Sequence, residues 1–188
     1  MRIRVSVLCL GAAVAMLLPR AVAGQDRPVE LGLDMGLALS LTNEFNGFEQ
    51  PNVTQLAVPN PVLRVGIFAS DMVSIEPSLQ FQLLKFEGSD AFYSLSPSLG
   101  VLIHFSPDRT RSQVYARPFA GADLVDPGSG DSQSQFHAGA GIGVKLPVGD
   151  KLAARLEAAF AHLFKSEDDG IPGANQIGVL IGFSFFTK

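Results

Sequence analysis

The last stretch of the chain, residues 176–186 (QIGVLIGFSFF), alternates between bulky apolar residues and small or polar ones. The bulky set is Ile177, Val179, Ile181, Phe183 and Phe185, with Leu180 and Phe186 as exceptions between them. A period of two is the side-chain period of a β-strand, so this stretch predicts a strand with two unlike faces. The same alternation recurs along the chain from residue 29 onward, and it limits the fold more than any other feature.

Seven further stretches show this period, at residues 29–41, 61–68, 73–83, 94–105, 114–124, 136–146 and 152–160. In each stretch one face is apolar and the other carries glycine, serine and charged residues. All ten glycines within the strands fall on the polar face: Gly32, Gly36, Gly66, Gly100, Gly121, Gly139, Gly141, Gly143, Gly178 and Gly182. Glycines gather where side chains have little room, as they do inside a narrow barrel of eight strands.

Alternation alone does not say which face is inside, because a soluble barrel of the lipocalin type also alternates. The apolar face carries about 40 mostly bulky residues, too many for the interior of an eight-stranded barrel. The polar face fits that space, so we expect the apolar face to point outward into lipid. The prediction is an all-β fold, an eight-stranded antiparallel up-and-down transmembrane β-barrel. A soluble barrel with the apolar face inside is the alternative.

Residues 1–23 are predicted to be a cleaved secretory signal, and residues 24–188 a single barrel domain. Arg2 and Arg4 precede an apolar run that ends near Leu18, and residues 21–23 (AVA) form a cleavage site. The remaining chain has no cysteine and holds 11 basic against 18 acidic residues, a net charge of −7. No basic patch for nucleic acid is present, and we expect no nucleic-acid partner.

The connections and the prolines add two expectations. Longer segments at residues 42–60, 125–135 and 165–175 alternate with short ones at 69–72, 106–112 and 147–150, as outer loops alternate with periplasmic turns. The short segment 87–90, between the third and fourth strands, is the exception. Pro77, Pro97 and Pro118 fall inside strands, where each removes a hydrogen-bond donor, so we expect bulges there, or strands that begin later than the alternation indicates. Phe68, Phe105, Phe183 and Phe185 are expected near the inner membrane interface, and Phe86, Phe92, Tyr93, Phe136 and Phe164 near the outer one.

Taken together, the signal, the eight strands, the Gly-x-Gly-x-Gly run at residues 139–143 and the aromatic last strand resemble the small outer-membrane β-barrel family. This is the OmpA-transmembrane-domain and OmpX-like group, also described as the outer membrane protein beta-barrel domain or porin family. The resemblance implies a monomer in the outer membrane of a Gram-negative bacterium, in contact with lipid and lipopolysaccharide. It also implies insertion by the assembly machinery, which recognises a terminal Phe. Here Thr187 and Lys188 follow Phe186.

The polar face carries nine charged residues, five acids and four bases. They are Glu30, Asp34, Arg64, Glu76, Arg117, Asp123, Lys145, Arg155 and Glu157. Charges inside a narrow barrel are costly unless they are paired. The residues therefore predict an interior charge network that plugs the lumen, with a gate or a narrow ion path as the alternative. Arg155 and Glu157 are expected to point inward together, with Lys145 and Arg117 as cross-strand partners.

The predicted function is a structural or surface-interaction role with a largely plugged lumen, without enzymatic activity, cofactor or metal. A narrow porin-like channel for ions or small solutes is the first alternative. A lipid-modifying enzyme is the second, because His104 and Ser106 resemble the His-x-Ser of the lipid A deacylase family, although no acid is placed beside them. The acidic loops at residues 126–131 and 166–170 could hold Ca²⁺ through oxygens, but neither has the EF-hand pattern.

Overall fold

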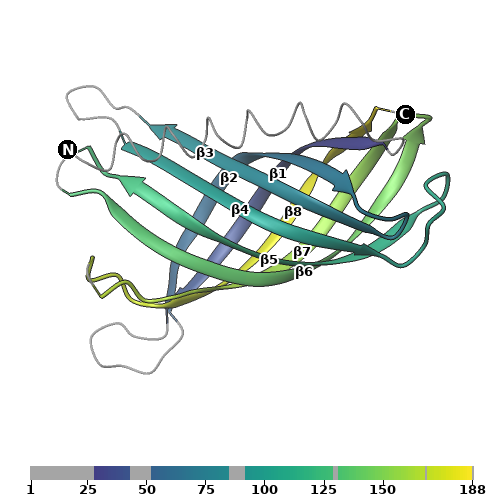
Figure 1. The fold of residues 1–188 in the computed structure, drawn as a ribbon. Helices are drawn as coiled ribbons and strands as arrows, with labels where there is room; N and C mark the ends of the chain where they lie inside the picture. The colour runs from purple at the N-terminus through teal and green to yellow at the C-terminus, as the bar shows by residue number, and fades with distance from the viewer. Residues whose placement is uncertain (1–27, 43–51, 85–91, 129–130, 168, 188) are drawn as a thin grey trace.

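The computed structural model describes residues 28–42, 52–84, 92–128, 131–167 and 169–187. These residues form a closed antiparallel barrel in which the strands neighbour one another in chain order, which confirms the predicted fold (Figure 1). The strands are β1 (Val29–Thr42), β2 (Asn52–Phe68), β3 (Val73–Leu84), β4 (Phe92–His104), β5 (Gln113–Asp126), β6 (Gln133–Gly149), β7 (Leu152–Leu163) and β8 (Ala174–Phe186). None of the described residues forms a helix long and apolar enough to cross a membrane. The predicted signal at residues 1–23 lies outside the described residues.

The two ends of the barrel differ in their connections. The short connections β2–β3, β4–β5 and β6–β7 lie at the end that also holds the C-terminus, and we call this the turn end (Figure 1). The other connections lie at the opposite end, the loop end. Of these, the connections at residues 43–51 and 85–91 lie outside the described residues, and they include the predicted short loop at 87–90.

The apolar face points outward, as predicted. On the outer surface Leu63 is 59% exposed and Ile181 is 63% exposed, whereas inward-facing Glu76 and Glu157 are fully buried. A surface with this many exposed Leu, Ile, Val and Phe side chains is built for contact with lipid. The alternative of a soluble barrel with an apolar interior is therefore wrong.

Two strands, β2 and β6, extend furthest beyond the bounds that the sequence predicted. β2 begins at Asn52 rather than near residue 61, so much of the predicted loop at 42–60 is strand paired with β1. Pro59 and Pro61 hid this strand, because proline lacks the donor that a central strand needs. β6 continues to Gly149 and takes in all of the predicted turn at 147–150 except Asp150.

The expected bulges at Pro77, Pro97 and Pro118 are not present, and β3, β4 and β5 do not begin later than predicted. Between β2 and β3 the pairs Arg64–Ser78 and Ile67–Ile75 lie three residues apart on both strands, so the register is kept across Pro77. The β4–β5 register is likewise kept across the prolines, with pairing interrupted beside each of them. The strands therefore accommodate each missing donor by a local gap in pairing, while the register shifts lie elsewhere, in β1–β2 and β6–β7.

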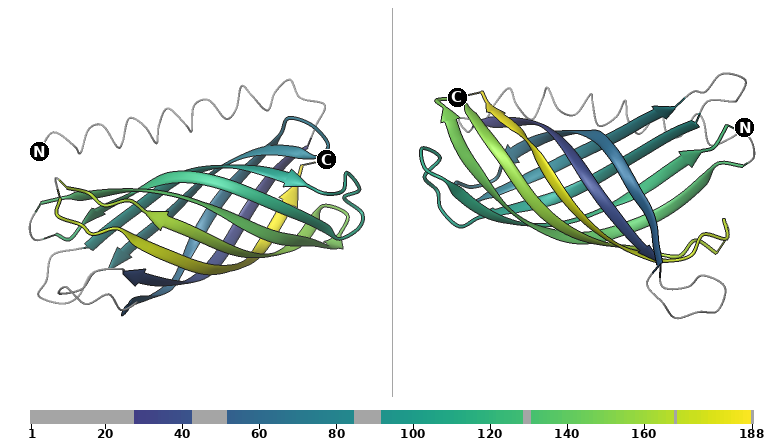
Figure 2. Two further views of the ribbon diagram at one scale, coloured as in Figure 1. Left: turned by 90° about the horizontal axis from the view of Figure 1, so that it is seen from below. Right: turned by 180° about the vertical axis from the view of Figure 1, so that it is seen from behind.

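The β2–β3 seam is paired only in the half of the barrel nearest the turn end. Its last pair toward the loop end is Val62–Gln80, whereas β3 stays paired with β4 as far as Leu84–Phe92. Beyond this point β2 and β3 diverge (Figure 2). The described part of β3 from Phe81 to Leu84 is thus paired on one side only.

Candidate functional site: a charged plug in the barrel

Eight charged side chains gather inside the barrel, and we call them the plug. They are Glu30, Asp34, Arg64, Glu76, Arg117, Lys145, Arg155 and Glu157, and each is 4% exposed or less. Each lies in the half of its strand nearest the turn end, at an inward position of the two-residue period. The structure therefore brings together all eight residues that the sequence assigned to the interior network.

Glycines on neighbouring strands make the room for these long side chains. The register places Gly66 opposite Glu30, Gly100 opposite Glu76, and Gly141 opposite Arg117. A Cβ atom added to Gly141 would lie 2.7 Å from Glu157 Oε1, and one added to Gly100 would lie 3.2 Å from Arg117 Cγ. The inward glycines noted in the sequence thus leave the space that the charged side chains occupy.

Glu76 is the first centre of the plug. Its Oε1 accepts hydrogen bonds from Arg64 Nη1 at 2.9 Å and from Arg155 Nη2 at 3.1 Å, and its Oε2 accepts one from Arg155 Nη1 at 2.7 Å. Arg64 also forms an ion pair with Asp34. One carboxylate from β3 is thus clamped by guanidinium groups from β2 and β7, which ties opposite walls of the barrel together.

Glu157 is the second centre. Its Oε1 accepts a hydrogen bond from Arg117 Nη2 at 2.5 Å, and its Oε2 accepts one from Arg155 Nη2 at 2.9 Å. Tyr115 links the same groups, since its hydroxyl accepts from Arg155 Nε at 2.7 Å and donates to Glu157 Oε2 at 2.8 Å. Tyr115 was not among the predicted site residues, although its place on the polar face of its strand was the signal for it.

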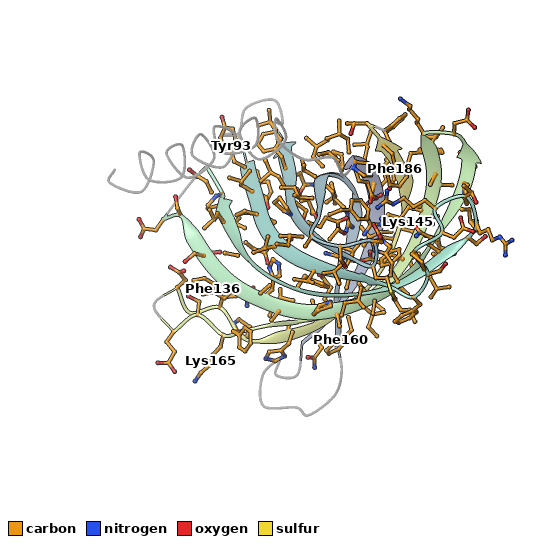
Figure 3. The ribbon with its side chains drawn as sticks, turned by 45° about the vertical axis from the view of Figure 1, so that its right-hand side comes forward. Tyr93, Phe136, Lys145, Phe160, Lys165 and Phe186 are labelled. Carbon is orange, nitrogen blue, oxygen red and sulfur yellow. The ribbon has the colours of Figure 1, made fainter. Side chains whose placement is uncertain are left out.

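Lys145 pairs differently from the prediction. Its backbone lies opposite Arg155, but its ammonium donates to Glu30 Oε2 at 2.5 Å and lies 3.1 Å from His104 Nε2. The reason is electrostatic, because a lysine beside an arginine turns toward the nearest carboxylate, here on β1. Figure 3 shows Lys145 and Phe186 together near the turn end, where the ammonium is 6.0 Å from the Phe186 ring.

Phe68 lies inside the barrel near Lys145, so its prediction as a membrane-interface residue is wrong. The ring is 1% exposed and stacks on His104, with 5.5 Å between ring centroids. Arg109, from the β4–β5 connection, lies over the same ring at 4.2 Å. Phe68 has the inward parity of Arg64 and Gly66, so the two-residue period was the better guide than the aromatic type. Phe105, Phe183 and Phe185, in contrast, are exposed on the outer surface.

The charges of the plug balance, with four carboxylates and four cationic groups. Removing charged groups from water is costly, and their mutual attraction offsets this cost only when pairing and hydrogen bonding are good. The paired groups come from strands on different sides of the barrel, among them β1, β3 and β7, so the plug fills this part of the interior with charges of balanced sign.

Asp123, the ninth predicted interior charge, lies outside the plug. Its Oδ2 is 3.0 Å from His137 Nδ1, and the two side chains are 27% and 12% exposed. Nearby, the hydroxyls of Ser78 and Ser98 share a hydrogen bond of 2.6 Å. This half of the lumen, toward the loop end, is therefore polar and reached by solvent, unlike the plug.

The structure gives the other predicted candidates separate partners. Ser106 Oγ accepts a hydrogen bond from the backbone N–H of Asp108, and His104 faces Lys145, so these contacts do not join the pair proposed as His-x-Ser. Asp108 also lies in the segment between β4 and β5, where hydrogen bonds from Thr110 hold the pKa of Asp108 below its ordinary value.

The acidic loops are also engaged within the protein. Asp126 accepts a hydrogen bond from the N–H of Gly128, and Asp169 accepts one from the N–H of Ser134, which lowers the pKa of Asp169. Among the described residues, no group of three or more His, Cys, Asp and Glu is placed to hold a metal ion.

Solved structures share this architecture at low sequence identity. The crystal structure of Neisserial surface protein A (NspA) superposes with a TM-score of 0.62 at 12% identity, covering 84% of this chain and 96% of that one. OprG from Pseudomonas aeruginosa gives 0.52 at 11% identity, covering 85% and 95% of the two chains. The N-terminal β-barrel domain of OprF from Pseudomonas aeruginosa gives 0.50 at 15%, covering 83% and 97%.

Comparison of the sequence with protein-family models and with curated proteins finds no match. The likeness to the solved structures shows the fold alone. The chain has the fold of the small eight-stranded outer-membrane β-barrels.

Proposed function

We propose that this protein is an outer-membrane barrel of a Gram-negative bacterium with a structural or surface-interaction role and a lumen that does not conduct. The observation that supports this role is the plug. Glu76 and Glu157 bind guanidinium groups from β2, β5 and β7, and Phe68 with Arg109 covers the turn end. A barrel closed in this way presents its outer surface to lipid and its loops to the exterior as its working surfaces.

The proposed location in the outer membrane follows from the apolar outer surface of the barrel. The exposed apolar side chains fit outer-membrane lipid and lipopolysaccharide, and closure of the barrel without a free sheet edge along most seams suits a monomer. We propose that residues 1–23 are removed on export and that the assembly machinery inserts the remaining chain. Thr187 extends the last strand, since it exchanges backbone and side-chain hydrogen bonds with Val29.

Single-channel recording in a planar lipid bilayer tests the closed lumen. We expect no steady conductance from the refolded protein. The variant Arg155→Ala/Glu157→Ala removes the side-chain hydrogen bonds that join these two residues to each other and to Glu76, Arg117 and Tyr115, and is expected to open a small conductance. The variant Gln80→Ala, changed at a half-buried position outside the plug, is the matched control and is expected to stay silent.

A narrow channel is the competing function, because the half of the lumen toward the loop end is polar and solvent-exposed. Steady conductance from the unmodified protein would favour the channel and would contradict the closed barrel. If the protein is silent and the double variant conducts, the plug is what closes it.

A further inference from the structure

Inward-facing residues of five neighbouring strands form one row that begins at Arg64 of the plug and continues to β6. Following the register from β2 to β6, the row reads Arg64, Ser78, Ser98, Gly121 and His137. Residues in one row lie directly opposite one another across neighbouring strands, so the side chains of adjacent members can interact. Ser98 and His137 are thus placed on either side of Gly121 in this row.

Gly121 leaves a space that both neighbours border. A Cβ atom added there would lie 2.6 Å from Ser98 Cβ and 2.7 Å from His137 Nε2. The imidazole of β6 therefore leans across β5 toward β4, over the position where any other residue would have a side chain. The ring edge that reaches toward Ser98 is Nε2, the nitrogen not used by Asp123.

Asp123 fixes the orientation and the tautomer of this imidazole. Its Oδ2 lies 3.0 Å from His137 Nδ1. A carboxylate can only accept a hydrogen bond at Nδ1, so in the neutral imidazole the proton lies on Nδ1 and Nε2 is the acceptor. A carboxylate, an imidazole and a hydroxyl in this order are the parts of a nucleophilic site for acyl transfer.

We propose that Ser98, His137 and Asp123 form a serine hydrolase site for small carboxylic esters that enter from the loop end. Ser98 is the nucleophile, His137 the general base, and Asp123 the residue that positions the base. The plug below the site is closed, whereas the side chains of His137 and Asp123 are 12% and 27% exposed, so water and substrate approach from one side. This activity goes beyond the proposed structural role and does not depend on it.

The reaction needs water as its only co-substrate. Ser98 Oγ forms a bond to the ester carbonyl carbon while its proton passes to His137 Nε2. The carbon–alkoxide bond then breaks, and the leaving alkoxide takes the proton from Nε2 to depart as an alcohol. Water, deprotonated by the same nitrogen, attacks the acyl-serine, and the carboxylic acid and the free hydroxyl are released.

Ser78 completes the arrangement. In the structure the Ser98 hydroxyl is turned toward Ser78, at 2.6 Å between the oxygens. Rotation about the Ser98 χ1 torsion, from one staggered position to another, swings its hydroxyl over Gly121 toward Nε2. The Ser78 hydroxyl is then released to donate a hydrogen bond to the oxyanion that forms beside it.

A fluorophosphonate, which phosphonylates activated serines with loss of fluoride, tests the site directly. The whole chain is refolded in detergent micelles, and labelling is followed by mass spectrometry of the intact protein and its peptides. We expect a single label on Ser98 and none in Ser98→Ala. The matched control Ser96→Ala changes a serine on the same strand and the same face, opposite Gln80, and should label at the unchanged rate.

The histidine variant separates an activated serine from a merely accessible one. Removal of a general base slows such a reaction by about 100-fold or more, so His137→Gln should label at least that much more slowly. Asp123→Asn should also be slower, and hydrolysis of p-nitrophenyl acetate should follow the same order among the variants. An absence of label on Ser98 in the folded protein would overturn the proposal, as would labelling of His137→Gln at the unmodified rate.

Discussion

Substitution of Glu76, the carboxylate that binds two guanidinium groups, tests how much the plug contributes to stability. The substitution Glu76→Gln keeps the size and shape of the side chain and removes its charge. Glutamine offers one oxygen, so the bonds made by Oε1 to Arg64 and Arg155 can survive, while its NH₂ group faces Arg155 Nη1 donor to donor. The plug is then left with three carboxylates against four cationic groups.

The expected loss of stability follows from these contacts. A hydrogen bond to a charged group contributes about 1.5–3 kcal/mol. Removal of one partner from a buried ion pair, which leaves the other charge unmatched, costs about 3–5 kcal/mol. Because Glu76 and its guanidinium partners Arg64 and Arg155 are all buried, we expect Glu76→Gln to lower the free energy of unfolding by about 4 kcal/mol.

Equilibrium unfolding in urea, followed by circular dichroism of the strand band, measures this change. The chain has no tryptophan, so fluorescence is a poor probe. Gln80→Ala, on the same strand and face but half-buried and outside the plug, is the control and should change stability by no more than about 0.5 kcal/mol. A loss below about 1 kcal/mol in Glu76→Gln would refute the prediction that these are buried, mutually dependent charges, because a loss of that size is expected for an ion pair exposed to solvent.

Three further outcomes are expected from other parts of the barrel. Gly141→Val places new atoms against Glu157 Oε1, 2.7 Å from the added Cβ, and should lower the free energy of unfolding by about 1–3 kcal/mol, whereas Gly149→Ala, with its nearest neighbour at 3.8 Å, should be nearly neutral. Phe68→Ala removes the ring that packs on His104 and Arg109, and should cost about 3–5 kcal/mol in the same urea assay. Every second amide in residues 81–84 lacks a partner on β2, so hydrogen exchange measured by NMR should be faster there than at the alternate amides paired with β4.

The two-residue period was enough to predict the barrel and the inward side of each strand. Volume then decided which face meets lipid, because the interior of eight strands cannot hold the larger face. The same parity assigned Arg64, Glu76 and Arg155 to the lumen, where the structure finds them. The same parity places Phe68 inside the barrel, where the structure finds it. The prediction for Phe68 was wrong because it relied on residue type, since an aromatic residue at a strand end is also typical of a membrane interface.

The partners within the lumen were beyond the sequence, because they depend on the register between strands. Lys145 lies opposite Arg155 but pairs with Glu30, which is 115 residues away in the chain. The closeness of Ser98 to His137 likewise depends on the register that brings both beside Gly121. The half of β2 nearest the loop end was missed for a different reason. Proline is found at strand edges, and the part of β2 that is not paired with β3 is such an edge, so Pro59 and Pro61 are compatible with a strand there.

Whether the plug exists for stability or for closure can be decided at Glu30 and Lys145. Lys145→Met leaves the Glu30 carboxylate without its ammonium and should lower the free energy of unfolding by about 3–5 kcal/mol. The double variant Glu30→Leu/Lys145→Met removes both charges and places apolar atoms near the rings of Phe68 and Phe186. Apolar replacement of a buried pair is often neutral or stabilising, so urea unfolding of the double variant should match the unmodified protein or exceed it. A double variant as unstable as Lys145→Met would instead show that this ion pair contributes net stability, and the charges would then need no role in closing the lumen.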